Sequence, residues 1–163
     1  MTDIIGLAPN VAIALSFLIG LVFGVAQVRA AARDRRDRLT LEALHNFQSR
    51  DFVEQMQYVI SHDLPADRKE LRSLPAGEQV YFLQFAQQME MLGILVAEKL
   101  LNLDLVEKTL GNLVTSTWEK YKPISEGLRK EDLFLNEYFQ WLAERIDERM
   151  VRHPRKPFYS SRP

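Results

Sequence analysis

The sequence contains no cysteine, which excludes a disulfide framework and any thiolate metal site. Histidine is also scarce. The three histidines lie far apart in the chain, so the two-histidine zinc spacing of H-E-x-x-H is absent. Neither G-x-x-x-x-G-K-[ST], G-x-G-x-x-G nor the G-x-S-x-G nucleophile elbow occurs. These absences predict a protein that is not an enzyme and holds no metal and no cofactor.

Alternating strand patterns and internal repeats are missing as well. The 163 residues are 47% apolar and 26% charged, which is typical of a globular protein and not of a disordered chain. Apolar residues recur instead at three-and-four spacing along most of the chain. The sequence therefore predicts an all-α fold, with one N-terminal transmembrane helix that continues into a stalk and then a small bundle of about five to six helices.

One long apolar run stands at the N-terminus. The 25 residues from Ile4 to Val28 carry no charge, and about 20 apolar residues are enough to span a bilayer core. Proline is tolerated best at a helix start, so Pro9 favours a helix that begins near it. We therefore predict a transmembrane helix over residues 9–28, preceded by a short extracytoplasmic N-terminus over residues 1–8.

A cleaved signal peptide is the competing interpretation of this run. Signal peptides carry positive charge before the apolar stretch, whereas the only charged side chain before this one is Asp3. The positive residues follow it: Arg29, Arg33, Arg35, Arg36 and Arg38. Basic residues concentrate on the cytoplasmic flank of a span, so we expect an uncleaved anchor with the N-terminus outside and the C-terminal domain in the cytoplasm.

Small residues form a stripe inside the predicted span. Ala12, Ser16, Gly20 and Gly24 recur every four residues and include a G-x-x-x-G motif. Such a stripe lets two helix backbones approach closely, which predicts a homodimer that pairs through the membrane helix. Glycine and alanine are also common in membrane helices that do not pair.

The arginines after the span predict a stalk over residues 29–44. The stretch has good helix formers and neither glycine nor proline, so the membrane helix should continue into it. An arginine cluster also fits nucleic acid, but this one has no interleaved aromatic residues. We predict contact with anionic lipid headgroups through Arg29, Arg33, Arg35, Arg36 and Arg38, and no nucleic-acid partner.

The remaining chain predicts a cytoplasmic helical domain over residues 45–150. Ser49 to Asp51 fits the cap of one helix. The stretch 80–101, which follows Pro75, is apolar on most sides and should be the central buried helix. It is not expected to be a second membrane span, because Glu90, Glu98 and Lys99 interrupt it.

Two further long helices are predicted in this domain. Asp104 to Glu107 fits a capping box, and Pro123 is expected to break the helix that follows. The last helix is predicted over residues 132–150.

Charge is segregated along the chain. Residues 39–148 carry a net charge of −8, whereas residues 149–163 carry +5. The basic, proline-containing tail over residues 151–163 is predicted to be disordered. With Phe158 and Tyr159 it could return to the membrane surface, or it could remain a solvated terminus.

Two features of the domain favour a polar or binding role. Glu90 lies in the middle of a nearly apolar helix, where a carboxylate needs a partner, and Arg129 is the candidate for a buried ion pair. Trp141 falls off the apolar face of the last helix, and an exposed tryptophan can anchor a partner. Both also have a purely structural interpretation. Glu90 and Arg129 would form an ion pair that fixes how two helices dock, and Trp141 would pack in the core or in a groove.

The stretch from Phe85 to Ile146 resembles a family of uncharacterised bacterial single-span membrane proteins with a cytoplasmic helical domain of unknown function. The resemblance is carried by six short elements: Glu90 with Leu92-Gly93, Leu105-Val106, Trp118-Glu119, Pro123-Ile124, Arg129, and Leu142-Ala143. It implies the bacterial inner membrane and makes Glu90 and Arg129 recurring polar positions. It implies no reaction and no ligand.

The sequence thus favours a membrane-anchored helical interaction module with an unknown protein partner. A membrane-associated sensor or effector in stress or phage defence is the alternative, and the small-residue stripe is its only support. An enzyme with an unrecognised site around Glu90 is the remote alternative.

Overall fold

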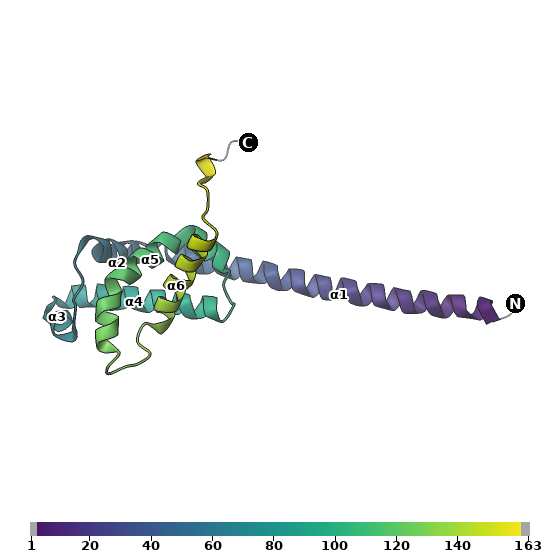
Figure 1. The fold of residues 1–163 in the computed structure, drawn as a ribbon, viewed down its shortest axis with the longest axis horizontal. Helices are drawn as coiled ribbons and strands as arrows, with labels where there is room; N and C mark the ends of the chain where they lie inside the picture. The colour runs from purple at the N-terminus through teal and green to yellow at the C-terminus, as the bar shows by residue number, and fades with distance from the viewer. Residues whose placement is uncertain (1–2, 161–163) are drawn as a thin grey trace. The chain divides into compact units, whose positions relative to one another are not determined.

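The computed structural model describes the chain over residues 3–160, with the side chains of all but residues 3–11, 14 and 158. Six α-helices and a short 3-10 helix follow one another (Figure 1). They are α1 (Asp3–Asn46), α2 (Arg50–Ser61), α3 (Arg68–Ser73), α4 (Ala76–Ala97), α5 (Leu103–Leu128), α6 (Glu137–Arg152) and η1 (Phe158–Ser160). No strand occurs over residues 3–160, and the predicted all-α class is confirmed.

The chain divides into two compact units, Met1–Arg38 and Leu39–Pro163. The second unit begins several residues before the predicted start at residue 45, because the last turns of α1 already belong to it. Leu44 is buried there, and Thr40 is buried and accepts a hydrogen bond at its Oγ1 from the backbone N–H of Asn102, at 2.8 Å. These contacts tie the C-terminal end of α1 to the start of α5.

Helix α1 is continuous from the apolar run through the arginine-rich segment, as predicted. It begins at Asp3 and not near Pro9, so most of the segment expected to precede the helix is helical; residues 1–2 lie outside the described range. Pro9 is therefore internal. It lies in the second turn and removes one backbone hydrogen bond, which the long helix after it can absorb. By length and composition alone, two stretches of the described chain could cross a membrane: Leu15–Asn46 and Ala76–Ala97.

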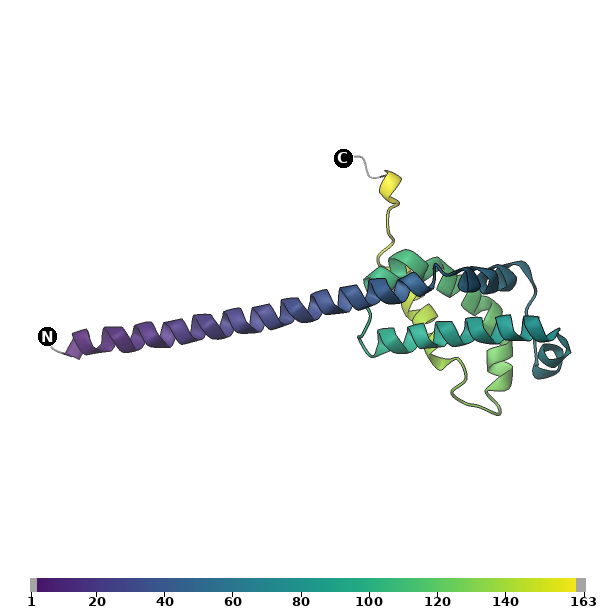
Figure 2. The ribbon, with the colours of Figure 1, turned by 180° about the vertical axis from the view of Figure 1, so that it is seen from behind.

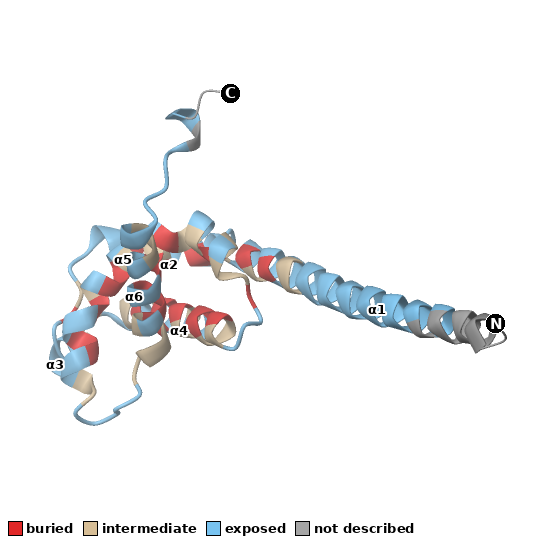
Figure 3. Ribbon diagram, turned by 45° about the vertical axis from the view of Figure 1, so that its right-hand side comes forward, coloured by how far each residue is buried: buried red, intermediate tan, exposed pale blue. Residues whose placement is uncertain are grey.

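The second of these stretches, α4, is the central helix of the bundle, as predicted. It packs against α2, α5 and α6, and Figure 2 shows α2 alongside it. Phe82 and Phe85 both stack on Tyr121 of α5, with ring centroids 4.7 and 5.9 Å apart. The Tyr121 hydroxyl donates to the Phe82 carbonyl at 2.8 Å, and burial raises the pKa of this tyrosine. The buried residues of Figure 3 accordingly follow α4 along its length.

The ends of α4 differ slightly from the predicted range of 80–101. Pro75 lies at its N-cap, and the helix stops at Ala97 because Lys99 adopts a left-handed conformation with φ 60°. The N–H groups of Leu100 and Leu101 then turn back to the Leu95 carbonyl, which closes the helix end. Leu101 is buried as a result.

The predicted break at Pro123 is wrong, because α5 runs unbroken from Leu103 to Leu128 with Pro123 inside it. Tyr121 and Ile124 on either side are fully buried and hold the helix against the core. Pro123 and Glu119, one turn earlier, are exposed. Water can therefore satisfy the Glu119 carbonyl that the proline leaves without a donor.

Both ends of α2 are capped. Ser49 Oγ accepts from the Phe52 N–H at 3.2 Å, so the predicted serine cap is confirmed. At the other end Lys120 Nζ of α5 donates to the carbonyls of Val59, Ile60 and His62 at 2.7–2.9 Å. A cation on the last carbonyls of a helix stabilises its negative end. These two caps set where α2 starts and stops beside α4.

Candidate functional site

A groove of about 800 Å³ opens between the end of α1, α2 and α4, all within the second unit. We call it the glutamine groove. Its lining combines apolar and aromatic side chains with amides and carboxylates: Ala43, Asn46, Phe47, Ser49, Asp51, Glu54, Gln55, Tyr81, Gln84, Gln87, Gln88, Met91, Leu92 and Leu95. The volume lies in the range of ligand and peptide sites.

The apolar part of the glutamine groove is supported by the core. Phe47 meets Phe52 edge-to-face with centroids 4.9 Å apart, and Phe52 stacks on Phe85 at 5.7 Å. Leu92 is buried below, whereas Met91 at the surface is 52% exposed. An aromatic wall held by a packed core is pre-organised, which lowers the entropic cost of binding.

Tyr81 forms a second aromatic element of the groove and leans on Tyr58, with ring centroids 5.9 Å apart. Tyr58 is buried, and its hydroxyl donates to Glu78 at 3.0 Å. Burial first, and then the hydrogen bond to Glu78, raise the pKa of Tyr58 to about 12. A tyrosine is already neutral at physiological pH, and the raised pKa extends that range upward, so Tyr81 leans on an uncharged ring.

A chain of amides crosses the groove wall. Gln55, which is buried, donates to Gln84 Oε1 at 2.8 Å and accepts from Gln88 Nε2 at 2.9 Å. This arrangement leaves the Gln84 NH₂ and the Gln88 carbonyl without a hydrogen bond among the described residues. One unused donor and one unused acceptor, one helical turn apart, match the alternating groups of an extended peptide backbone.

The α2 side of the groove is acidic. Asp51 makes no hydrogen bond or ion pair in the described part of the chain. Glu54 bonds Arg50 at 2.7 Å, one turn away on the same exposed face. Exposed pairs of this kind contribute little, so Glu54 can exchange its partner readily.

The buried ion pair predicted between Glu90 and Arg129 is not formed. Glu90 instead accepts two hydrogen bonds from the start of α6, from the N–H groups of Tyr138 at 3.2 Å and Phe139 at 2.7 Å. A carboxylate at this position satisfies unpaired donors and faces the positive end of the helix dipole. The sequence could not show this because helix N-terminal N–H groups are backbone atoms with no sequence signature of their own.

Arg129 also binds the chain at the start of α6. Its guanidinium donates to the carbonyls of Leu135, at 2.8 Å, and Asn136, at 3.0 Å, and to the Gln140 side chain. It also lies over the Trp118 ring, 5.9 Å from the centroid. Glu90 and Arg129 thus both hold the start of α6, one through its N–H groups and the other through the carbonyls before it.

The conformation of Asn136 explains why α6 begins at Glu137 and not near Asp132. Asn136 is left-handed, with φ 53°, and turns its amide to Ser125 Oγ at 3.0 Å instead of capping the helix. Glu90 of α4 replaces the missing cap. The hollow of about 400 Å³ beside Glu90 is lined mainly by apolar residues such as Phe82, Ile124 and Phe134.

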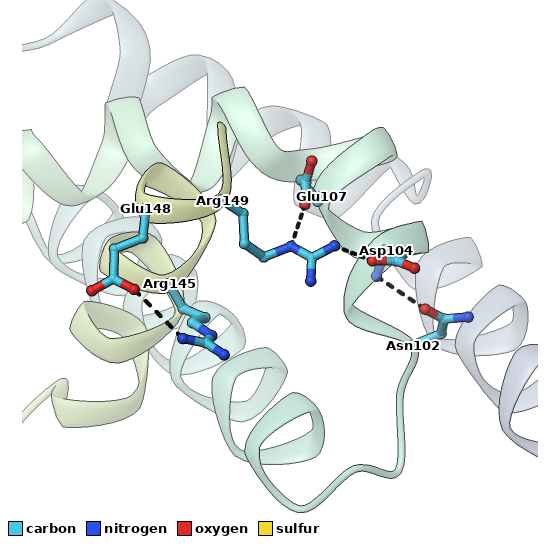
Figure 4. A network of polar contacts seen from close by, with 6 residues as sticks. All are labelled: Asn102, Asp104, Glu107, Arg145, Glu148 and Arg149. Atoms are coloured by element: carbon cyan, nitrogen blue, oxygen red, sulfur yellow. Dashed lines mark hydrogen bonds and ion pairs between the residues drawn. The ribbon is translucent and has the colours of Figure 1, made fainter. Parts of the chain in front are cut away.

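An ion network joins the far ends of α5 and α6 (Figure 4). Arg149 bonds Glu107, at 2.7 Å, and Asp104. Asn102 caps α5 by accepting from the Asp104 N–H, where the sequence predicted Asp104 itself to begin the capping box. The Glu107 hydrogen bond, with Asp104 nearby, raises the pKa of Arg149. These contacts tie the end of α6 to the start of α5.

Of the other predicted residues, all but Arg36 are exposed. Trp141 is 38% exposed on α6. Ala12, Ser16, Gly20 and Gly24 are exposed on α1, and Ser16 Oγ donates to the Ala12 carbonyl at 2.8 Å. Of the stalk arginines Arg36 is half-buried, and the others are exposed: Arg29, Arg33, Arg35 and Arg38.

Sequence reasoning missed the glutamine groove altogether. The available signal was the pair Gln84 and Gln88, one turn apart on a helix that is otherwise apolar. The third amide, Gln55, is 29 residues from Gln84 in the chain, so only the packing of α2 on α4 brings the set together.

Comparison with known proteins yields one family. The sequence profile of the family described as "Domain of unknown function (DUF4760)" matches residues 14–146. No curated protein and no solved structure matches the chain significantly.

Proposed function

Given that this chain belongs to the DUF4760 family, whose function is unknown, we propose from its own geometry that it is a membrane-anchored, non-enzymatic interaction module that binds a protein partner in the glutamine groove. The observation that carries the proposal is the groove itself. It combines an aromatic wall, unused amide hydrogen-bonding groups and an acidic side on one rigid surface. Glu90 supports the non-enzymatic role, because backbone donors engage both of its carboxylate oxygens.

The anchor is α1, and its orientation is part of the proposal. Its apolar side chains are exposed, for example Phe17 at 72% and Phe23 at 71%. Exposed apolar surface of this size is unfavourable in water and favourable in lipid. The arginines that follow support a cytoplasmic domain in the bacterial inner membrane and contact with anionic headgroups. A signal sequence would share the apolar helix, but not this order of charges.

The partner-binding role predicts a site-specific crosslink. The photoreactive residue p-benzoylphenylalanine, placed at Gln87 on the exposed rim of the groove, should crosslink the full chain to a protein in isolated bacterial membranes. The matched control position is Glu119, which is exposed on α5 outside the groove. Equal products at both positions, or release of the chain from membranes by alkaline carbonate, would contradict the proposal.

Pairing through the membrane helix is a separate part of the proposal. Replacing both Gly20 and Gly24 by isoleucine should abolish most self-association in a membrane dimerisation assay, since bulk on the stripe keeps the backbones apart. A Cβ at either glycine meets nothing within 4 Å, so the change leaves the single chain undisturbed. Ala26→Ile, on another face of α1, is the matched control and should associate normally. Unchanged association of the double variant would exclude pairing through this stripe.

A further inference from the structure

We propose that the occupant of the glutamine groove is the part of the basic tail that follows α6, residues 153–163, of a second copy of this chain. The inference rests on the proposed function and names the partner that the groove binds. Three properties of the groove define what fits it: an aromatic wall formed by Phe47 and Tyr81, unused backbone-like groups on Gln84 and Gln88, and the carboxylates of α2. A segment that is extended and basic and that also has apolar side chains is complementary to these three properties.

The tail has these properties in its sequence. Pro154-Arg155-Lys156-Pro157 is a P-x-x-P element, and Phe158 and Tyr159 follow it directly. Prolines separated by two residues favour the polyproline II conformation, which docks on aromatic-lined grooves at low entropic cost. The Pro157 carbonyl accepts from Ser160 at the start of η1, whereas Arg155 and Lys156 make no backbone hydrogen bond in the described chain, so their N–H and C=O groups can meet the Gln84 NH₂ and the Gln88 carbonyl.

Charge complementarity supports the same occupant. The tail carries only positive charges, whereas the body of the domain has a net charge of −8. In the groove, Asp51 has no hydrogen bond or ion pair in the described chain, and Glu54 has only the exposed Arg50. Arg155 and Lys156, between the prolines, are the complementary charges.

The tail and the groove of one chain are not joined to each other. Residues 153–157 have no helix or strand, and they are exposed; Tyr159 is 93% exposed. On the groove side, Asp51, Gln84, Gln87 and Met91 are also exposed. Anchoring in a membrane raises the effective concentration of neighbouring copies, so binding in trans can be strong even where each contact is weak.

The absence of cysteine makes a direct test available. Two copies of the full chain with different size tags would be produced in one membrane, one with Gln87→Cys and the other with Tyr159→Cys. Both positions are exposed, so neither substitution disturbs the core. Oxidation should give a disulfide-linked product of mixed size. A copy with Glu119→Cys in place of Gln87→Cys is the matched control and should give at least about tenfold less.

The charge contribution is tested in the same assay. Adding Asp51→Lys to the Gln87→Cys copy should reduce the mixed product about tenfold, and adding Glu144→Lys, on the exposed face of α6, should not. High salt should lower the product as well, because the attraction between exposed charges is screened.

Three outcomes would overturn the inference. The first comes from a third variant, a chain that carries both Gln87→Cys and Tyr159→Cys: a disulfide within this chain, with none between the two single-cysteine copies, would make the tail an intramolecular occupant. The second is no link between positions 87 and 159 while p-benzoylphenylalanine at Gln87 still captures another protein; the groove would then bind a different partner and the proposed function would stand. Failure of both crosslinks would reject the proposed function too.

Discussion

Replacing Gly93 by alanine is expected to lower the free energy of unfolding by about 3 kcal/mol, a large part of the stability of a small domain. A Cβ at Gly93 would lie 2.3 Å from the carbonyl oxygen of Tyr138 and 2.6 Å from its carbonyl carbon. Both are backbone atoms, so no side-chain rotation relieves the clash. The Tyr138 backbone is also held by Glu90 on the same helix as Gly93, at 3.2 Å, so α6 cannot move away without losing that bond.

The matched control is Gly77→Ala on the same helix. Nothing lies within 4 Å of a Cβ at Gly77, and alanine favours the helix by up to about 1 kcal/mol, so this variant should be neutral or more stable. Urea unfolding of the full chain in detergent, followed by circular dichroism, measures both variants. If Gly93→Ala unfolds at the same urea concentration as the parent, α4 and α6 do not pack as closely as described.

Replacing Glu90 by alanine is expected to cost about 3 kcal/mol as well, for an electrostatic reason. The change leaves the N–H groups of Tyr138 and Phe139 without their acceptor and removes the negative charge at the start of α6. Glu90→Gln should cost less, about 1–2 kcal/mol, because its carbonyl oxygen can still accept one of the two bonds. Asn136 cannot compensate, since its side chain is committed to Ser125.

Hydrogen exchange gives this prediction a local readout. The amides of Tyr138 and Phe139 should exchange faster in Glu90→Ala, whereas amides in the middle of α2 should change only with global stability. Glu119→Gln, an exposed carboxylate on α5, is the matched control and should leave both rates unchanged. Parent-like exchange at Tyr138 and Phe139 in Glu90→Ala would show that Glu90 does not cap α6.

Several elements of this fold were predictable because their causes are local in sequence. The uncharged run from Ile4 to Val28 and the helix formers after it predict one long helix, and α1 is one. Ser49 predicts the start of α2, since a cap acts over three residues. The central helix follows from apolarity on most of its sides, which only a core or a membrane accommodates.

Pro123 and Asn136 show where local rules fail. Proline disfavours a helix interior by about 3 kcal/mol, yet Tyr121 and Ile124 are buried on either side of Pro123 and hold α5 together. Asn136 is left-handed because Arg129 and Ser125 bind it, and both belong to a different helical segment. In each case tertiary packing or hydrogen bonds from a neighbouring segment outweigh the preference of one residue.

The sequence by itself determined that this protein is all-helical, that its N-terminus carries a long apolar helix followed by arginines, and that the middle of the chain supplies the core. It also determined that Glu90 needs a partner, because burying a carboxylate in an apolar helix without a hydrogen bond or ion pair is energetically costly. Which partner it has was decided by the tertiary structure, since the N–H groups of α6 come within reach only when α6 packs on α4. The glutamine groove has the same origin. Gln55, Gln84 and Gln88 form one surface only because α2 packs on α4, and the spacing of these residues in the sequence does not show that they are close in space.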